Sequence, residues 1–542
     1  MKRLQTIHRV TTDSLFLYHI KRRIKFYNAL TLLIRSDPKL SLRRKYLHLQ
    51  KSAFIRKLDF QGHLETSKEY ESCLKKNRKF LTEISDYYPT NSFRKDVFKK
   101  LCNLKRFSID RLNAKYLRYF RKLENLGLVE ESIDMIPYLK KYRQAFTKAT
   151  NINLLSSFSP LVFFLQKYEF LYPSFAAKKL SLSITLTQVS EIDLMLFHAF
   201  TEGLRSLSII GTKDSRKIDE IISPEHHKNL TSLSLTRFSA NRSWDIQQEI
   251  NVIAKIKDFE KLSRLSLNIS SSSEADVEKF FLNFDLPPKL KYLHMSLTIK
   301  SQVEKLNLTN FYKAFEKAND VRKFNLSVKF IIYFHPEYVN RISFILSHLK
   351  KLERAILNFS PEYIKKFPEE NRVFNLGCIL NSLSSNKDLR WLYITSSNCK
   401  ALNTDNPIPS FKNLENLYLV FKKPITAGHE LFHLLEIFGD KLRELNIDFQ
   451  WHISSKKFIE ILAKLRKLKN LESIKARIFL TDFDKQVFEE FALTLAQLNY
   501  IKVFIFSLGI HLKYHPQNFQ RIERILAAKK YLDRPSFSPL YF

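Results

Sequence analysis

Residues 290–295 read LKYLHM, and related hexads follow it: VRKFNL begins at residue 321, LERAIL at 352 and LRWLYI at 389. Positions 1 and 4 of these hexads are apolar, and so is position 6. The alternation at positions 4 and 6 is what a half-buried β-strand requires. Further copies, spaced by about thirty residues on average, begin at 204 (LRSLSI), 230 (LTSLSL), 262 (LSRLSL), 414 (LENLYL), 442 (LRELNI), 471 (LESIKA) and 501 (IKVFIF).

The segments between the hexads have the spacing of amphipathic helices. In SSKKFIEILAKLRKLKNL, residues 454–471, the apolar side chains recur at i, i+3, i+4 and i+7. Those side chains are Phe458, Ile461, Leu462 and Leu465. A strand followed by a helix, repeated many times, predicts an α/β array with a parallel sheet lined by helices.

This pattern resembles the leucine-rich repeat family, in particular its long-repeat, ribonuclease-inhibitor-like type. The resemblance covers residues 204–510, and weaker copies extend it toward the N-terminus. They begin at 55 (IRKLDF), 81 (LTEISD), 104 (LKRFSI), 123 (LENLGL), 149 (ATNINL) and 177 (AKKLSL). The resemblance implies a solenoid with strands on a concave face and helices on a convex face. The chain departs from the family at position 9 of the repeat, where the expected asparagine or cysteine is missing.

We divide the chain into four segments on this basis. Residues 1–50 form a basic, helical N-terminal cap, residues 51–203 hold degenerate basic repeats, residues 204–514 hold the clearer repeats, and residues 515–542 form a C-terminal cap and tail. The net charge of +36 is concentrated at the N-terminus: residues 1–150 carry 35 Lys and Arg against 14 Asp and Glu. Such local basic charge attracts nucleic acid, an anionic membrane or an acidic protein.

In the family that the chain resembles, partners dock on the concave strand face, at the non-leucine positions of the hexad. The stretch from residue 290 to residue 393 places large aromatic and basic residues there, which are types enriched at binding hot spots. The predicted partner-binding residues are Lys291, Tyr292, His294, Arg322, Lys323, Asn325, Arg390, Trp391, Tyr393 and Tyr418.

The basic N-terminal third supplies a second candidate site. Its lysines and arginines suit phosphates, and its interleaved tyrosines suit exposed bases. The residues of this candidate nucleic-acid patch are Arg22, Arg23, Arg43, Arg44, Tyr116, Arg118, Tyr119 and Arg121. A third alternative is a divergent F-box-like N-terminus of a ubiquitin-ligase substrate adaptor, although residues 1–50 lack the Leu-Pro start and the tryptophan of such a module.

Residues 429–433 read HELFH, which matches the HExxH motif of zinc peptidases. On a helix, the apolar residues Leu431, Leu434 and Leu435 would face the sheet, and both histidines would face solvent on the other side. No third ligand follows at the expected spacing, so we interpret the motif as accidental. Glycine is scarce and no phosphate-binding loop is present. We therefore expect no enzymatic activity, no metal and no cofactor.

The sequence predicts a non-enzymatic scaffold whose partner is another protein, with a nucleic-acid or ribonucleoprotein role as the alternative. No run of eighteen uncharged apolar residues occurs, so no membrane insertion is expected. No small-molecule substrate is predicted. The scattered cysteines fit a reducing intracellular compartment, cytoplasmic or nuclear. The basic, nearly acid-free start is interpreted as an amphipathic first helix, with a mitochondrial targeting segment as the alternative.

Overall fold

The computed structural model is an array of strand–helix units. It describes residues 57–59, 83–85, 103–109, 124–129, 151–157, 179–186, 190–211, 218–237, 246–271, 279–280, 282–299, 309–318, 320–330, 336–361, 376–396, 410–421, 440–480, 485–498, 500–501, 503–510, 522, 524–525 and 534–541. Two compact units divide the chain, Met1–Leu230 and Thr231–Phe542. The division into four segments at residues 50, 203 and 514 remains a prediction.

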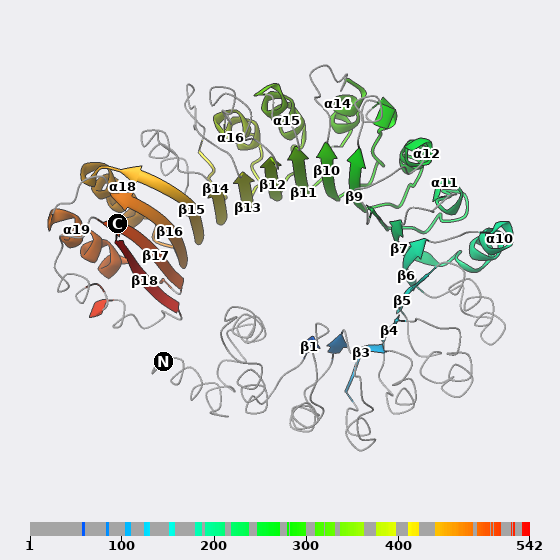
Figure 1. Ribbon diagram of the computed structural model, residues 1–542, viewed down its shortest axis with the longest axis horizontal. Coiled ribbons are helices and arrows are strands. Elements are labelled where there is room, and N and C mark those ends of the chain that lie inside the picture. Colours follow the sequence, from blue (N-terminus) through cyan, green and yellow to red (C-terminus); the bar gives the residue numbers. More distant parts are fainter. Residues whose placement is uncertain are drawn as a thin grey trace. The chain divides into compact units, whose positions relative to one another are not determined.

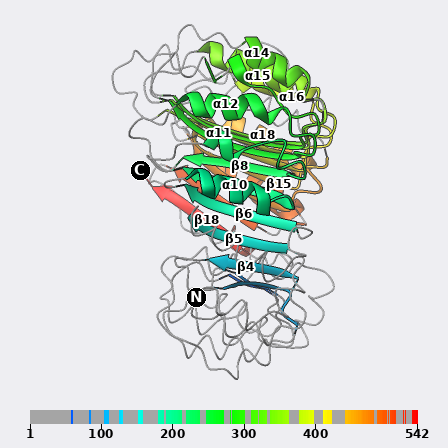
Figure 2. The same cartoon turned by 90° about the vertical axis from the view of Figure 1, so that its right-hand side faces the viewer.

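The first unit contains short parallel strands that pair in chain order, each with the next. They are β1 (Lys57–Asp59), β2 (Glu83–Ser85), β3 (Arg106–Ile109), β4 (Asn125–Val129), β5 (Asn151–Ser157), β6 (Lys179–Leu186) and β7 (Leu204–Gly211). Two helices, α10 (Glu191–Phe200) and α11 (Ile218–Ile221), lie on one side of β6 and β7 (Figures 1 and 2).

The second unit repeats the arrangement with strands of six to ten residues, again parallel and paired in chain order. These strands are β8 (Ser232–Arg237), β9 (Arg264–Ser271), β10 (Tyr292–Ile299), β11 (Lys323–Phe330), β12 (Arg354–Pro361), β13 (Trp391–Ser396), β14 (Asn416–Phe421), β15 (Glu444–Ile453), β16 (Ser473–Leu480), β17 (Val503–Ile510) and β18 (Arg534–Tyr541).

The described helices of the second unit all cover one face of this sheet (Figure 1). They are α12 (Ile246–Ile256), α14 (Thr309–Glu316), α15 (Pro336–His348), α16 (Leu376–Ser384), α18 (Ser455–Lys467) and α19 (Lys485–Gln497). We call the opposite side of strands β8 to β17 the open face, because among the described residues no helix lies on it. The predicted α/β array of parallel strands and helices is thereby confirmed, whereas the predicted N-terminal cap lies outside the described residues.

Every predicted hexad coincides with a strand, and from the hexad at residue 230 onward the strand begins at the third hexad position. The apolar positions form the core between sheet and helices. In the hexad at residue 290, the side chains of Leu290, Leu293 and Met295 are at most 2% exposed. Position 1 is buried in the same way at Val321, and corresponding residues line the other repeats. Removing these apolar side chains from water is the main force that holds successive repeats together.

The helix predicted within residues 454–471 is confirmed as α18. Ser454 caps its N-terminus by accepting a hydrogen bond from the backbone N–H of Lys457 at 3.4 Å. Phe458, Ile461, Leu462 and Leu465 are buried against the sheet. Large aromatic side chains fill the same layer elsewhere; Phe315 of α14, for example, meets Phe324 of β11 edge to face at 5.9 Å.

Asparagine side chains join consecutive repeats at the turn that precedes the strand. Where a hexad is preceded by Lys-Asn, the asparagine amide donates to a backbone carbonyl of the previous repeat. Asn413 reaches Lys387 at 2.7 Å, and Asn470 reaches Asp440 at 2.7 Å. The Lys-Asn-Leu triplets at 228, 412 and 469 carry this signal in the sequence.

The final strand was not predicted. β18 pairs in parallel with β17 although it contains Pro535 and Pro539, which interrupt the hexad pattern. Proline lacks the N–H group that a strand offers to a neighbour on each side, so it is confined to edge strands. Among the described strands β18 pairs only with β17, and this edge position explains why its prolines are tolerated.

Candidate functional site on the open face

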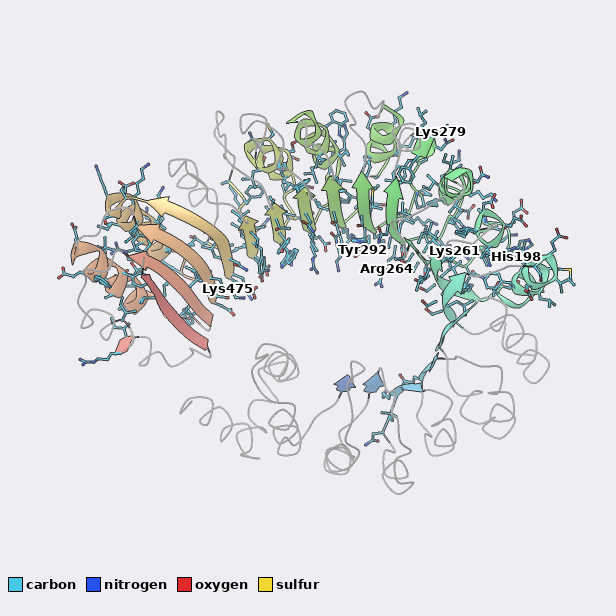
Figure 3. The ribbon with its side chains drawn as sticks, in the orientation of Figure 1. His198, Lys261, Arg264, Lys279, Tyr292 and Lys475 are labelled. Carbon is cyan, nitrogen blue, oxygen red and sulfur yellow. The ribbon has the colours of Figure 1, made fainter. Side chains whose placement is uncertain are left out.

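The open face is built from the hexad positions that alternate with the buried ones. Because side chains of a strand point alternately to opposite faces, positions 3 and 5 of each hexad lie on the open face when position 4 is buried. In β10, Tyr292 and His294 are half-buried on either side of the fully buried Leu293. Figure 3 shows Tyr292 beside Arg264 of β9, on the side of the sheet away from the helices. Lys475 of β16 lies on the same side of its own strand.

Parallel pairing aligns the predicted residues in rows across the strands. Position 3 forms one row, which runs through Arg264, Tyr292, Lys323, Arg354, Trp391, Asn416 and Glu444. Position 5 forms the next row, which runs through Ser266, His294, Asn325, Ile356, Tyr393, Tyr418 and Asn446. Seven of the ten predicted partner-binding residues lie in these two rows.

The other three predicted residues, Lys291, Arg322 and Arg390, precede their strands and form a rim along one edge of the open face. Their backbones continue the sheet, since Arg322 N–H donates to the carbonyl of Lys291 at 2.9 Å. The rim also contains Glu353, whose carboxylate accepts from the Arg322 guanidinium at 3.1 Å. Both side chains are more than a third exposed, at 53% and 39%, so water and salt weaken this ion pair.

Trp391 lies at the centre of an aromatic cluster, which we define as Trp391, Tyr393 and Tyr418. The Trp391 ring centroid is 6.0 Å from that of Tyr393 on the same strand, with nearly parallel planes. It is 5.4 Å from that of Tyr418 on the neighbouring strand. The Tyr393 and Tyr418 centroids are 5.9 Å apart. Three half-buried rings thus form one continuous amphipathic surface on β13 and β14.

Arg354 completes this cluster, and it is the main functional candidate that the sequence analysis missed. Its guanidinium carbon lies 3.9 Å from the Trp391 ring centroid, which is cation–π geometry. Arg354 also follows Lys323 directly in the position-3 row. Arg354 is the third residue of the hexad LERAIL. Comparing the third residues of consecutive hexads would have placed it between Lys323 and Trp391.

Glu444 brings negative charge to the other side of the cluster. The hydroxyl of Tyr418 donates a hydrogen bond to the Glu444 carboxylate. Burial raises the pKa of Tyr418 above its ordinary value, and the hydrogen bond and negative charge of Glu444 raise it further. Tyr418 therefore stays a neutral hydrogen-bond donor, and it holds the carboxylate against the sheet.

His294 contributes no positive charge to the open face near neutral pH. Burial lowers the pKa of its imidazole, and a hydrogen bond with Asn325 offsets this only in part. The buried Nδ1 atom of His294 has no hydrogen-bond partner. The basic character of this region therefore comes from its lysines and arginines.

Several predicted features fall outside the described residues. These are the candidate nucleic-acid patch (Arg22, Arg23, Arg43, Arg44, Tyr116, Arg118, Tyr119 and Arg121), the F-box-like segment 1–50 and the HELFH motif at 429–433. Across the part of the chain that the structure describes, no group of three or more His, Cys, Asp or Glu side chains is arranged to hold a metal ion. No described helix is both long and apolar enough to cross a membrane.

No protein-family model matches the chain, and no curated protein matches it. The residues of the open face are therefore the main indication of function.

Proposed function

We propose that the chain is a non-enzymatic leucine-rich repeat scaffold that binds another protein through the open face of its second unit. The family assignment is supported by the repeated hexads, by their parallel strands and by helices on one side of the sheet. At position 9 of the repeat the chain differs from the family. The residues there, Ser270, Thr298 and Lys329, lie in register within the parallel strands β9 to β11.

The observation that carries the proposal is the aromatic cluster with Arg354 stacked on Trp391. Tryptophan, tyrosine and arginine are the residues most enriched at protein-binding hot spots. Here they gather on a strand face and are neither packed under a helix nor fully buried. Because they are held by a rigid sheet, they lose little conformational entropy when a partner covers them.

The test compares two aromatic substitutions in the full chain, Trp391→Ala on the open face and Phe344→Ala on α15. Phe344 is 43% exposed on the helical side and serves as the matched control. Each purified protein is immobilised and incubated with lysate of the source organism, either untreated or treated with nuclease. The retained proteins are quantified by mass spectrometry. Thermal unfolding followed by circular dichroism verifies that both variants fold.

We expect at least one protein whose retention falls about tenfold with Trp391→Ala, as loss of a hot-spot residue implies, and which Phe344→Ala leaves unchanged. Equal retention by both variants and the wild type would refute binding through the open face. Loss of all retained proteins on nuclease treatment would instead favour the nucleic-acid alternative.

A further inference from the structure

The charge of the open face and its rim changes along the sheet. From β9 to β13 the charged side chains are almost all basic, and Glu353 is the exception. From β14 to β16 carboxylates appear, namely Glu415, Glu444 and Glu472, together with Arg443 and Lys475. We define the basic section as Arg264, Lys291, Arg322, Lys323, Arg354 and Arg390.

Among the residues that the structure describes, most cations of the basic section have no ion-pair partner. Within the described part of the chain, no ion pair involves Arg264, Lys323 or Arg390, and all three side chains are exposed. The positive field also acts on Asp320, which lies in the turn just before the rim residue Arg322. Lys351 lowers the pKa of that carboxyl most strongly, and Arg322 and Lys291 lower it further. The section therefore has capacity for additional negative charge.

The spacing of the cations matches an extended chain that crosses the strands. Arg264, Tyr292, Lys323, Arg354 and Trp391 lie in register on five consecutive strands. With neighbouring strands ~4.8 Å apart, this row is ~19 Å long, which is the length of about six residues in extended conformation. Carboxylates on such a segment can meet Arg264, Lys323 and Arg354, while an apolar side chain reaches the aromatic cluster.

A protein segment fits this surface better than a nucleic acid does. A nucleic acid carries phosphate along its whole length, and it would meet the carboxylates of Glu415 and Glu444 next to the aromatic cluster. Stacking of a base also needs an uncovered ring, and one face of the Trp391 ring already carries the Arg354 guanidinium. A polypeptide can be acidic at one end and apolar at the other.

We propose that the partner presents an extended acidic segment, whose carboxylates face Arg264, Lys323 and Arg354 and whose apolar end covers the aromatic cluster. This inference rests on the proposed function and specifies the chemistry of the partner. Binding is expected to weaken as salt rises, because the exposed cations contribute by long-range attraction.

The experiment selects a random library of displayed 12-residue peptides against the full chain at physiological salt. The selected peptides are synthesised, and their affinities are measured for the wild type and for single charge reversals. Lys323→Glu and Arg264→Glu remove the proposed contacts without touching the aromatic rings. Lys475→Glu, on the open face beyond the basic section, is the matched control, and Trp391→Ala reports binding at the aromatic cluster. A 12-nucleotide uridine RNA is titrated in parallel.

The inference predicts that selected peptides are rich in Asp and Glu, and that Lys323→Glu and Arg264→Glu each weaken them at least tenfold while Lys475→Glu changes affinity less than twofold. Neutral or basic peptides that depend on Trp391 would overturn the acidic segment and leave the proposed function intact. Absence of any peptide that depends on Trp391 would count against both. RNA that binds more tightly than every peptide and depends on Lys323 would overturn both in favour of nucleic acid.

Discussion

At the scale of single residues, the first unit contains a buried histidine, His227, whose hydrogen bond with Thr201 fixes the tautomer of its neutral ring. The hydroxyl of Thr201 donates to the carbonyl of Phe197 at 2.6 Å, so its oxygen accepts the proton of His227 Nε2 at 3.1 Å. The buried Nδ1 atom of His227 then has no partner. The His198 ring lies 5.4 Å away and is itself stacked on His226 at 4.2 Å.

We predict that this histidine makes the first unit sensitive to acid. Burial, together with the charges of His198 and His226, lowers the pKa of His227 from 6.5 to about 3. Above the unfolded pKa of 6.5 both states are neutral, and as pH falls below it the unfolded state takes up the proton first. Because the unfolded state then binds a proton that the folded state does not, the free energy of unfolding at pH 5 should be about 2 kcal/mol lower than it is at neutral pH.

Urea unfolding at pH 7 and pH 5 measures this effect. His227→Gln, which retains a donor for Thr201, should reduce the loss of stability between the two pH values. His348→Gln on α15 of the second unit serves as the control and should leave that loss unchanged. A wild-type protein whose first unit is equally stable at both pH values would contradict the assignment.

At the scale of elements, the turns before several strands are tied to a neighbouring repeat by side chains as well as by the sheet. Asn386 lies before β13, is 3% exposed, and its Oδ1 accepts the backbone N–H of Leu352 at 3.2 Å. Lys441 donates to Asn413 Oδ1 at 2.6 Å between the repeats that begin at 414 and 442. These contacts fix the separation of successive strands where the chain enters the sheet.

Replacing Asn386 with alanine should therefore destabilise the second unit by about 1–3 kcal/mol, because the buried N–H of Leu352 would lose its acceptor. Asn413→Ala is the matched control: its partners are exposed, so water replaces them and the loss should be smaller. Denaturant unfolding of both variants gives the comparison. Equal losses of stability in the two variants would mean that burial does not determine how much these hydrogen bonds stabilise the second unit.

The sequence predicted the elements well because their pattern is local. Each hexad holds its own burial signal, and Leu293 or Leu392 is apolar whatever the rest of the chain does. Side-chain partnerships were less accessible, since they join residues about thirty positions apart. Two examples are the contact of Arg354 with Trp391 and the ion pair of Arg322 with Glu353. Both depend on the register in which neighbouring strands pair. β18 was missed because its prolines are acceptable only at an edge, which is a property of the sheet.

At the scale of the whole molecule, stability comes from many similar interfaces between neighbouring repeats. The core of the second unit is a continuous row of apolar side chains from strand to strand. Leu293 belongs to this row on β10, between β9 and β11, and its side chain is 0% exposed. A defect in one repeat should therefore affect its neighbours most and distant repeats least.

Leu293→Ala tests this expectation. It should cost about 2–5 kcal/mol, the range for deleting a buried leucine side chain. Hydrogen exchange measured by mass spectrometry should show faster exchange in β9, β10 and β11 and little change in β16 and β17. Uniformly faster exchange across the second unit would indicate a single cooperative unit, contrary to a nearest-neighbour array.

The central claim, that the open face binds a protein, is tested most directly by photo-crosslinking. The crosslinker p-benzoylphenylalanine is placed in the full chain instead of Tyr393 on the open face or, as the control, instead of Tyr500, which is 60% exposed in the turn before β17. After irradiation in nuclease-treated lysate, the account predicts a discrete protein adduct from position 393 that position 500 does not give and that Arg354→Ala diminishes. Identical adducts from both positions, or none from position 393, would contradict it.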